Sequence, residues 1–554
     1  MIIDVTRLHI SPFAVEGIVE MKMEQSLNDH AVMYVKGIVP KETGDAGVTD
    51  TDDSTVVTVS APDGVIFKGL VQDIRASFEG QVYYLEVWAV SFSIRADTQV
   101  RSRSFQDAGM NYRQIAEQMA GESGLAVSVE TDPLQINRLL LQYQETNWAF
   151  LKRIASHDHS VLLPSVTEEA FYFGIPKGNR MGSLLSYRFS VGKNIRRFRT
   201  YAGAGVDVSA EDSVEYIVTA DDSVLSIGDT VDYGGNTLFV RETQIHLKDA
   251  VLSCRYVLCP ERGLKVPTAY NRHITGLTLA GQVLEVKEDT VKVLLCVDES
   301  QDTAAAYAFP YITPYSAENH TGLYLMPEVD DVVHIQFPTE DESLAVAQSS
   351  YRQTPSDRSV EPGIKYLRTP NDKEIRISDK EILITAKTGG LFVKLHEDEG
   401  IEIFSQHGIL VNTLSGLDVL AGGHISMTAG DSIVLSAGSG CSINAGKDID
   451  ARAGKGISMH AGAEVSASSG KEMTFSAMEK LGMETQKEFV LNAEKDMTIV
   501  TQKKLSISSK EDMAQESKKK VKISAGSEVG ISCKASSIKM DGAMNLKASR
   551  IKEN

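Results

Sequence analysis

The C-terminal part of the chain repeats a pattern of eight residues. From 400 to 535 it divides into 17 octads, of which HISMTAGD at 424–431 is representative. The second position of every octad is hydrophobic, the fourth is apolar in all but one, and the sixth is always small. Because side chains alternate along a strand, positions two, four and six lie on one face. The pattern therefore predicts one short strand in every octad.

Each octad is also predicted to end in a corner. The seventh position is Gly in seven successive octads from Gly422 to Gly470, and Gly adopts backbone angles closed to other residues. One strand of about five residues covers a single side of a solenoid, which needs roughly three sides per turn. We therefore expect three copies to wind around one axis as an intertwined β-helix, a needle roughly 80 Å long at ~4.8 Å per stacked strand. A single-chain β-solenoid is the alternative.

Side chains at the second and fourth positions form the expected needle core. Gln515 is the one polar residue among the fourth positions, and a buried amide is costly unless it is hydrogen-bonded. Three Gln515 side chains meeting on a threefold axis would bond to one another and set the register, as a lone polar layer does in coiled coils. The alternative is a locally loosened needle in which Gln515 faces water. The core residues are Ile425, Ile433, Ile443, Ile457, Phe475, Phe489, Ile507, Gln515 and Ile523.

Shorter alternating patterns before the octads predict a mostly β chain. Five short segments between 273 and 351 predict a small closed barrel of the oligonucleotide/oligosaccharide-binding (OB) type. The region before it is mostly strand, with two helices expected near 111–124 and 146–157 and an exposed acidic loop at 45–53. Pro355, Pro362 and Pro370 mark a linker. The predicted boundaries are 1–268, 269–351, 352–399 for the linker and first needle strands, and 400–554 for the octads.

Charge and composition narrow the possible functions. The 75 acidic residues outnumber 56 basic ones, and a net charge of -19 disfavours nucleic-acid binding. The chain has no leader typical of a signal peptide and no apolar run of ~20 residues, so assembly in the cytoplasm is expected. The end from 471 onward is basic, with 15 Lys and 1 Arg against 12 acids. That end is either a solvated surface or a surface that meets an anionic partner.

The sequence contains no convincing catalytic or metal-binding motif, so no catalytic residue, cofactor or metal is expected. His157 and His159 flank Asp158 without further ligands, which is typical of a polar loop. Cys254 and Cys259 are five residues apart and read as unpaired thiols. One alternative function is a β-helical polysaccharide- or peptidoglycan-degrading enzyme. Such an enzyme needs charged residues clustered on one face of its solenoid, and the sequence shows no such cluster. A fibrous adhesin is another alternative.

Three stretches together resemble the VgrG proteins of type VI secretion and the hub and spike of contractile phage tails. SFQDAGMNYRQIAEQM and LQYQETNWAFLKRIASHDHSVLL are similar to the tail-hub region, MPEVDDVVHIQF to a strand and turn of the spike barrel, and the octads to the needle. Asp330 stands where the barrel motif usually has Gly. The matching hub residues are Gln144, Glu145, Thr146, Trp148, Phe150, Leu151 and Arg153; the matching barrel residues are Pro327, Glu328, Val329 and Asp331.

The resemblance implies a structural homotrimer with two β-barrel domains per chain in its hub. Such a spike caps the inner tube and punctures the target envelope when the sheath contracts. The partners implied are the inner tube protein, baseplate proteins, a PAAR-like tip cap, effector cargo and, briefly, the target membrane. The resemblance also implies delivery outside the cell or into a target, but it does not identify the kind of machine.

Overall fold

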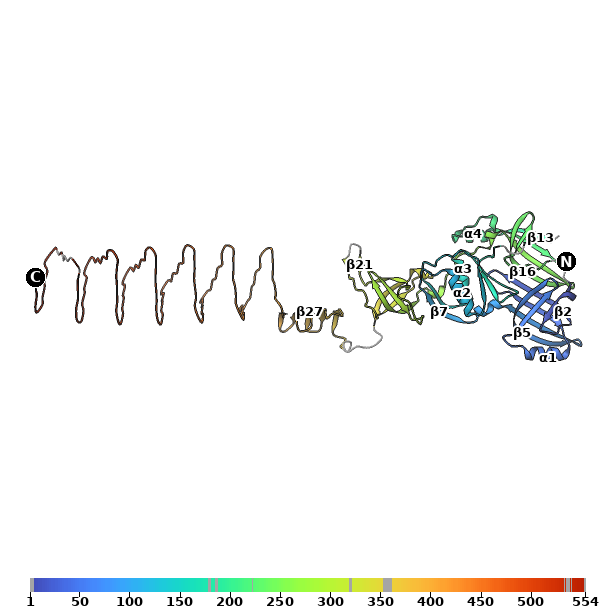
Figure 1. Cartoon of the computed structure of the whole chain (residues 1–554), viewed down its shortest axis with the longest axis horizontal. Helices are drawn as coiled ribbons and strands as arrows, with labels where there is room; N and C mark the ends of the chain where they lie inside the picture. The colour runs from blue at the N-terminus through green and yellow to red at the C-terminus, as the bar shows by residue number, and fades with distance from the viewer. Residues whose placement is uncertain are drawn as a thin grey trace. The chain divides into compact units, whose positions relative to one another are not determined.

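A computed structural model of the chain (Figure 1) describes residues 4–177, 181–184, 188–221, 223–317, 321–351, 361–532, 534, 539 and 541–552. The chain divides into two compact units, Met1–Asn412 and Thr413–Asn554. All helices and strands of the described residues belong to the first unit. They are mainly strands, which confirms the predicted mostly β class.

We call the described residues up to 268 the hub. Twelve strands of the hub pair in one sheet. The main path runs β1-β4-β5-β6-β3-β2-β16-β17-β14-β13, and β12 and β15 attach to it at β16. The pair β2–β16 joins an N-terminal set of strands to a later set. The predicted division into two barrel domains, like the predicted boundaries, stays a prediction. The strands are β1 (His9–Ser11), β2 (Gly17–Ser26), β3 (Val32–Ile38), β4 (Val56–Ala61), β5 (Gly64–Glu79), β6 (Val82–Ser91), β12 (Met181–Ser183), β13 (Arg188–Lys193), β14 (Val214–Ala220), β15 (Thr230–Tyr233), β16 (Asn236–Lys248) and β17 (Val251–Cys259).

Both predicted helices form, and capping explains where they begin. Asn111 and Gln114 make a capping box at the start of α2 (Tyr112–Glu122). Thr146 caps α3 (Asn147–Ser156), since its side chain accepts a hydrogen bond from Ala149 N. The sequence patterns missed α4 (Ile195–Gly203). Around α2 and α3 lie β7 (Val100–Phe105), β8 (Ala126–Val129), β9 (Leu140–Thr146), β10 (Leu162–Pro164) and β11 (Ala170–Phe173).

The prediction of an acidic loop at 45–53 is wrong for most of its length, because Lys41–Asp50 forms helix α1. The two glycines that lower its helix propensity are the positions where α1 packs on the sheet. A Cβ at Gly44 would lie 3.2 Å from Val39, and one at Gly47 would lie 3.6 Å from Phe13. Packing against the sheet therefore overrides local propensity here.

The predicted five-stranded barrel is confirmed as a closed barrel in the order β18-β19-β20-β24-β23. Apolar side chains that alternate along these strands fill its core, among them Val283, Val293 and Ile335. The strand that follows the barrel motif begins only at Val332, since 323–331 forms an irregular connection. The strands are β18 (Thr278–Lys287), β19 (Thr290–Leu295), β20 (Ala308–Ile312), β23 (Val332–Gln336) and β24 (Val346–Tyr351), with a small hairpin of β21 (Ser316–Ala317) and β22 (Thr321–Gly322).

A five-stranded antiparallel meander follows the barrel and contains the predicted first needle strands. The part of the predicted linker at 352–360, with Pro355, lies outside the described residues. The register of the strands places nine aliphatic side chains on one face: Leu367, Ile375, Ile377, Ile382, Ile384, Val393, Leu395, Ile401 and Ile403. The strands are β25 (Lys365–Arg368), β26 (Glu374–Ile377), β27 (Glu381–Lys387), β28 (Leu391–His396) and β29 (Gly400–Ser405).

The second unit is an extended chain that bends at regular intervals, as its zigzag trace in Figure 1 shows. Bends fall on the seventh and eighth positions of every octad from 406–407 to 526–527, which confirms the predicted corners. They continue at 541–542 and at Ser549, one residue out of step. Bends therefore also occur beyond 535, where the 17 regular octads end.

Candidate functional site: the joint between hub and barrel

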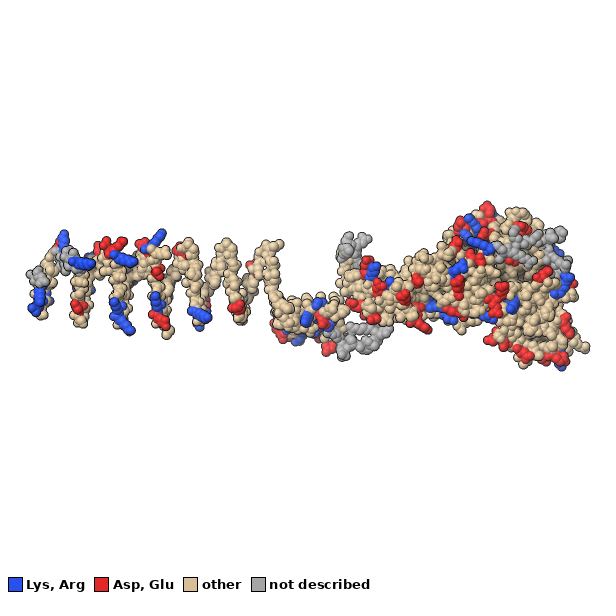
Figure 2. Space-filling model, viewed as in Figure 1, with Lys and Arg blue, Asp and Glu red and all other residues tan. Residues whose placement is uncertain are grey.

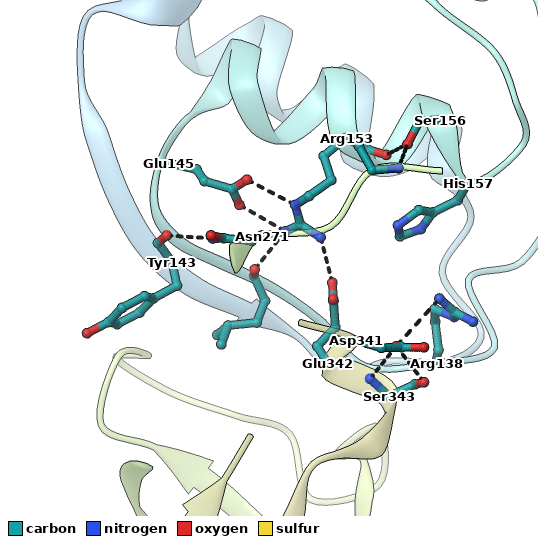
Figure 3. Close-up of polar contacts among 12 residues, drawn as sticks. Arg138, Tyr143, Glu145, Arg153, Ser156, His157, Asn271, Asp341, Glu342 and Ser343 are labelled. Carbon is teal, nitrogen blue, oxygen red and sulfur yellow. Dashed lines mark hydrogen bonds and ion pairs between the residues drawn. The ribbon is translucent and has the colours of Figure 1, made fainter. Parts of the chain in front are cut away.

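Helix α3 carries the hub motif and presents it to two different surroundings. The side chains of Trp148, Phe150 and Leu151 are buried in a hub core that also contains α2. The indole of Trp148 donates to the carbonyl of Asn28 at 3.1 Å. Arg153 comes from the last turn of the same helix and reaches the barrel instead (Figure 3). We call the contact region around Arg153 the joint.

Arg153 is the centre of the joint and pairs with two carboxylates. Its Nε and Nη2 donate to the two carboxylate oxygens of Glu145 at 2.9 Å each, as a fork. Nη1 donates to Glu342 Oε1 at 2.8 Å, and Nη2 also donates to the carbonyl of Leu141 at 2.8 Å. The side chain of Arg153 is only 4% exposed and that of Glu342 is fully buried. Glu342 belongs to the 3-10 turn η6 (Glu342–Leu344), directly before the last barrel strand.

The charges of the joint determine the protonation of Arg153. Burial alone lowers the pKa of this guanidinium, but the charges and hydrogen bonds of Glu342 and Glu145 outweigh burial and raise the pKa. Arg153 is therefore a permanent cation between two carboxylates. Glu342 Oε2 is buried and has no hydrogen-bond partner among the described residues.

His157 lies beside this ion pair at the end of α3. Its Nδ1 is 3.4 Å from the hydroxyl of Tyr112, and its buried Nε2 has no partner among the described residues. Burial lowers the pKa of His157 to about 4, with Arg153 adding to the effect against the opposing charge of Glu342. His157 is thus a neutral, largely buried imidazole and part of the joint, rather than a residue of the polar loop expected from the sequence.

Polar contacts of β7 and of the hub loops also tie the hub to the barrel. Asp298 accepts from Ser104 N at 2.7 Å and from Ser104 Oγ at 2.5 Å. Gln106 donates to the carbonyl of Val293 at 3.2 Å and accepts from Tyr307 N at 3.2 Å. Burial raises the pKa of Asp298, although its bonds to Ser104 oppose this change.

Strand β9 belongs to the hub by its pairing and to the barrel by its packing. It pairs with β7, yet Leu139 and Leu141, before and within it, lie in the hydrophobic core of the barrel. Asn271 donates to the carbonyl of Tyr143 in the same strand at 2.8 Å. Strand β9 and the residue before it therefore contribute Leu140 to the hub core and Leu139 and Leu141 to the barrel core.

The structure brings some of the predicted hub residues together and gives others separate tasks. Glu145 and Arg153 meet in the joint, whereas Thr146 caps α3 and also donates to Asp97. Gln144 takes a left-handed backbone conformation with φ 50°. The partner that the sequence patterns missed is Glu342, because nothing around it distinguishes it from the acids beside it.

The barrel motif forms a tight turn that closes on β18. Asp330 has φ 72°, which confirms that Asp takes the left-handed conformation in place of the usual Gly. Asp331 accepts from Glu328 N at 2.9 Å through its carboxylate and from Val283 N at 2.8 Å through its carbonyl. Pro327 is buried, while Val329 is exposed. This turn positions β23 in the barrel.

The predicted needle core residues are not brought together within one chain. All nine, from Ile425 to Ile523, are exposed along the octads, Gln515 included. Among the described residues of Thr413–Asn554 no backbone N–H donates to another backbone carbonyl. An isolated octad region therefore has neither a core nor paired strands.

Across the described residues, no three His, Cys, Asp or Glu side chains lie together in a way that would hold a metal ion. None of the helices among those residues has the length and apolar character needed to cross a membrane.

Similarity to known proteins covers the octads and, in architecture, the first unit. Residues 392–549 match a family model described as an uncharacterized protein conserved in bacteria (DUF2345). No curated protein matches the chain.

Solved structures that are similar in architecture to this chain include those of three bacterial or prophage proteins. The E. coli c3393 protein, described as a component of the type VI secretion system, is 12% identical, with a TM-score of 0.45 over 62% of this chain and 99% of its own. A chain of the Francisella PdpA–VgrG complex is 7% identical, with a TM-score of 0.46 over 72% of this chain and 87% of its own. The 43 kDa tail protein of prophage MuSo2 from Shewanella oneidensis is 12% identical, with a TM-score of 0.38 over 47% and 98%.

DUF2345 is a C-terminal domain of VgrG proteins, and in this chain it spans all 17 octads. The octad region of this chain is therefore similar to the C-terminal domain of VgrG proteins, which agrees with the resemblance found in the sequence.

Proposed function

We propose that three copies of this chain form the spike of a contractile injection machine. The observation that carries the proposal is the second unit, in which corners recur every eighth residue while the apolar side chains of each octad stay exposed. Unpaired backbone groups and a long apolar stripe are stable in water only when other strands cover them. Other copies of the same chain offer strands of matching length and corner spacing.

The meander supports a common axis that starts before the octads. Strand β29 is both the last strand of the meander and the first octad, so Ile401 and Ile403 occupy the second and fourth octad positions. They pair with Leu395 and Val393 of β28. The aliphatic face of the meander thus includes the second and fourth positions of the first octad. Three such faces around one axis would bury each other.

The role proposed for the spike is mechanical rather than catalytic. The hub would cap the inner tube and contact the baseplate, and the needle would puncture the target envelope, with a PAAR-like cap on its tip and effector cargo attached. Sheath contraction would supply the work. The joint suits this role, because a buried, hydrogen-bonded connection transmits axial force from the hub to the barrel without bending.

The mass and the shape of the purified protein test the proposal. Light scattering should give roughly 180 kDa, three times the 60.4 kDa of one chain, and negative staining should show a nail-shaped particle. A monomer would contradict the proposal. Degradation of peptidoglycan or polysaccharide in a zymogram would favour the enzyme instead, and binding of the isolated protein to intact target cells would favour the adhesin.

A further inference from the structure

The corners of the last octads carry charges that alternate in sign. A corner is here the seventh and eighth positions of one octad with the first position of the next. Five successive corners, from 494–496 to 526–528, have net charges of −1, +2, −1, +3 and −1. The three corners before them, from 470–472 to 486–488, are each neutral. The charged residues of the five corners are Glu494, Lys495, Asp496, Lys503, Lys504, Lys510, Glu511, Asp512, Lys518, Lys519, Lys520 and Glu528.

These charges lack partners of opposite sign within their own chain. Among the described residues of Thr413–Asn554, the one ion pair joins Arg452 to Asp450 at 2.6 Å. A whole strand separates neighbouring corners, so the cations at 518–520 cannot reach the acids at 511–512. Figure 2 shows blue and red side chains on the bends towards the C-terminal end of this unit, whereas the first bends are mostly tan.

We propose that the alternating corners set the register between copies of the chain in the needle. The inference rests on the proposed trimer, in which every octad steps to the next face. On any face, an octad is then followed by the next octad of a neighbouring copy, one strand spacing of ~4.8 Å along the axis. Each cationic corner therefore stacks between two anionic corners of other copies. Opposite charges at this separation attract, and like charges placed there are destabilising.

The apolar core cannot select this register by itself. Its second and fourth positions are hydrophobic in nearly every octad, so a copy displaced by one octad buries an almost equivalent set of side chains. Such a slip would stack the corner at 518–520 on its own counterpart, or on the cations at 503–504. The corner charges thus disfavour registers that the core tolerates.

Zero-length carbodiimide cross-linking of the full-length wild-type protein tests the register directly. We expect covalent dimers and trimers on a denaturing gel, with peptides linking Lys518, Lys519 or Lys520 to Asp512 and Glu528. An extended octad spans roughly 23 Å from its first to its last residue, so these links join different copies. Links between corners two octads apart, such as Lys510 to Glu494 or Glu528, would overturn the proposal.

A charge reversal with a matched control gives a second test. K518E/K519E/K520E creates three successive anionic corners, and we expect a several-fold lower yield of detergent-resistant trimer at low salt, partly recovered at high salt. K41E/K248E/K287E changes the net charge equally at exposed positions outside the octads and should keep the wild-type yield. Equal behaviour of the two variants would overturn the proposal. A monomeric wild-type protein would instead overturn the trimer, whereas a trimer without links between successive corners would overturn the register alone.

Discussion

Arg153 and Glu342 form a buried ion pair 2.8 Å long between residues 189 positions apart, and this pair joins the hub to the barrel. One guanidinium donates to both Glu342 and Glu145, and its Nη2 donates to the carbonyl of Leu141 as well. Separating either carboxylate from Arg153 would leave a buried charge without a counter-charge. Arg153 therefore adds a buried charge-paired contact to the apolar packing of β9 and the hydrogen bonds of Ser104 and Gln106.

Arg153→Met should destabilise the hub and barrel by about 3–5 kcal/mol, because two buried carboxylates lose their counter-charge. Chemical denaturation followed by tryptophan fluorescence measures the loss. The matched control is Arg75→Met, which breaks an exposed pair with Asp73 and should change the stability by at most ~1 kcal/mol. Equal losses for the two variants would show that the joint contributes no more than a surface pair.

The stability of the hub should fall as the pH decreases from about 6.5 to about 4. The pKa of His157 is lowered to about 4 in the folded chain, against 6.5 in the unfolded one, so the unfolded state takes up the proton first in this window. The contribution is lost progressively and amounts to at most ~3 kcal/mol. Unfolding of His157→Gln at several pH values should show a flatter dependence. An unchanged slope would contradict the assignment.

Asp330→Val should destabilise the barrel by roughly 1–2 kcal/mol, because a β-branched residue disfavours the left-handed conformation that Asp330 adopts at φ 72°. Asp330→Gly should be close to neutral. Glu328→Val, two residues earlier and exposed, is the control for added hydrophobicity. Thermal melts of the three variants measure the change in stability. If Glu328→Val lowers the melting temperature as much as Asp330→Val does, the backbone explanation is refuted.

Ile457→Asp should abolish the detergent-resistant trimer. It would place three carboxylates on the proposed axis, where each is desolvated and repels the others. Lys455→Asp introduces the same side chain two residues earlier, at a corner, and should leave the trimer intact. A gel of unboiled samples compares them. Survival of the Ile457→Asp trimer would argue against an inward second position.

Gln515→Leu should keep or raise the melting temperature while increasing misaligned or aggregated trimers. Replacing the polar layer improves burial but removes hydrogen bonds that are available in one alignment only. Ile523→Leu, at the fourth position of the next octad, is the control. The measurement is the fraction of trimer recovered after refolding. If that fraction matches the control, Gln515 has no role in register.

The sequence alone determined the features that repeat or that depend on neighbouring residues. The octad period, its corners, the helices α2 and α3, and the five barrel strands all follow from patterns a few residues long. Such patterns are reliable because strand alternation, helix capping and turn formation are local effects.

Tertiary structure decided what depends on contacts between distant segments. Helix α1 forms on a glycine-containing sequence because the sheet beneath it accepts a close approach. Glu342 becomes the partner of Arg153 because folding buries both at one place, and no short pattern distinguishes this acid from its neighbours. In the described part of the octads the local pattern is clear and the long-range contacts are missing. Their pattern predicts strands and corners, but the described octads after β29 form no paired strands within one chain. Backbone hydrogen bonds between strands need a second strand, and in the proposed spike that strand comes from another copy.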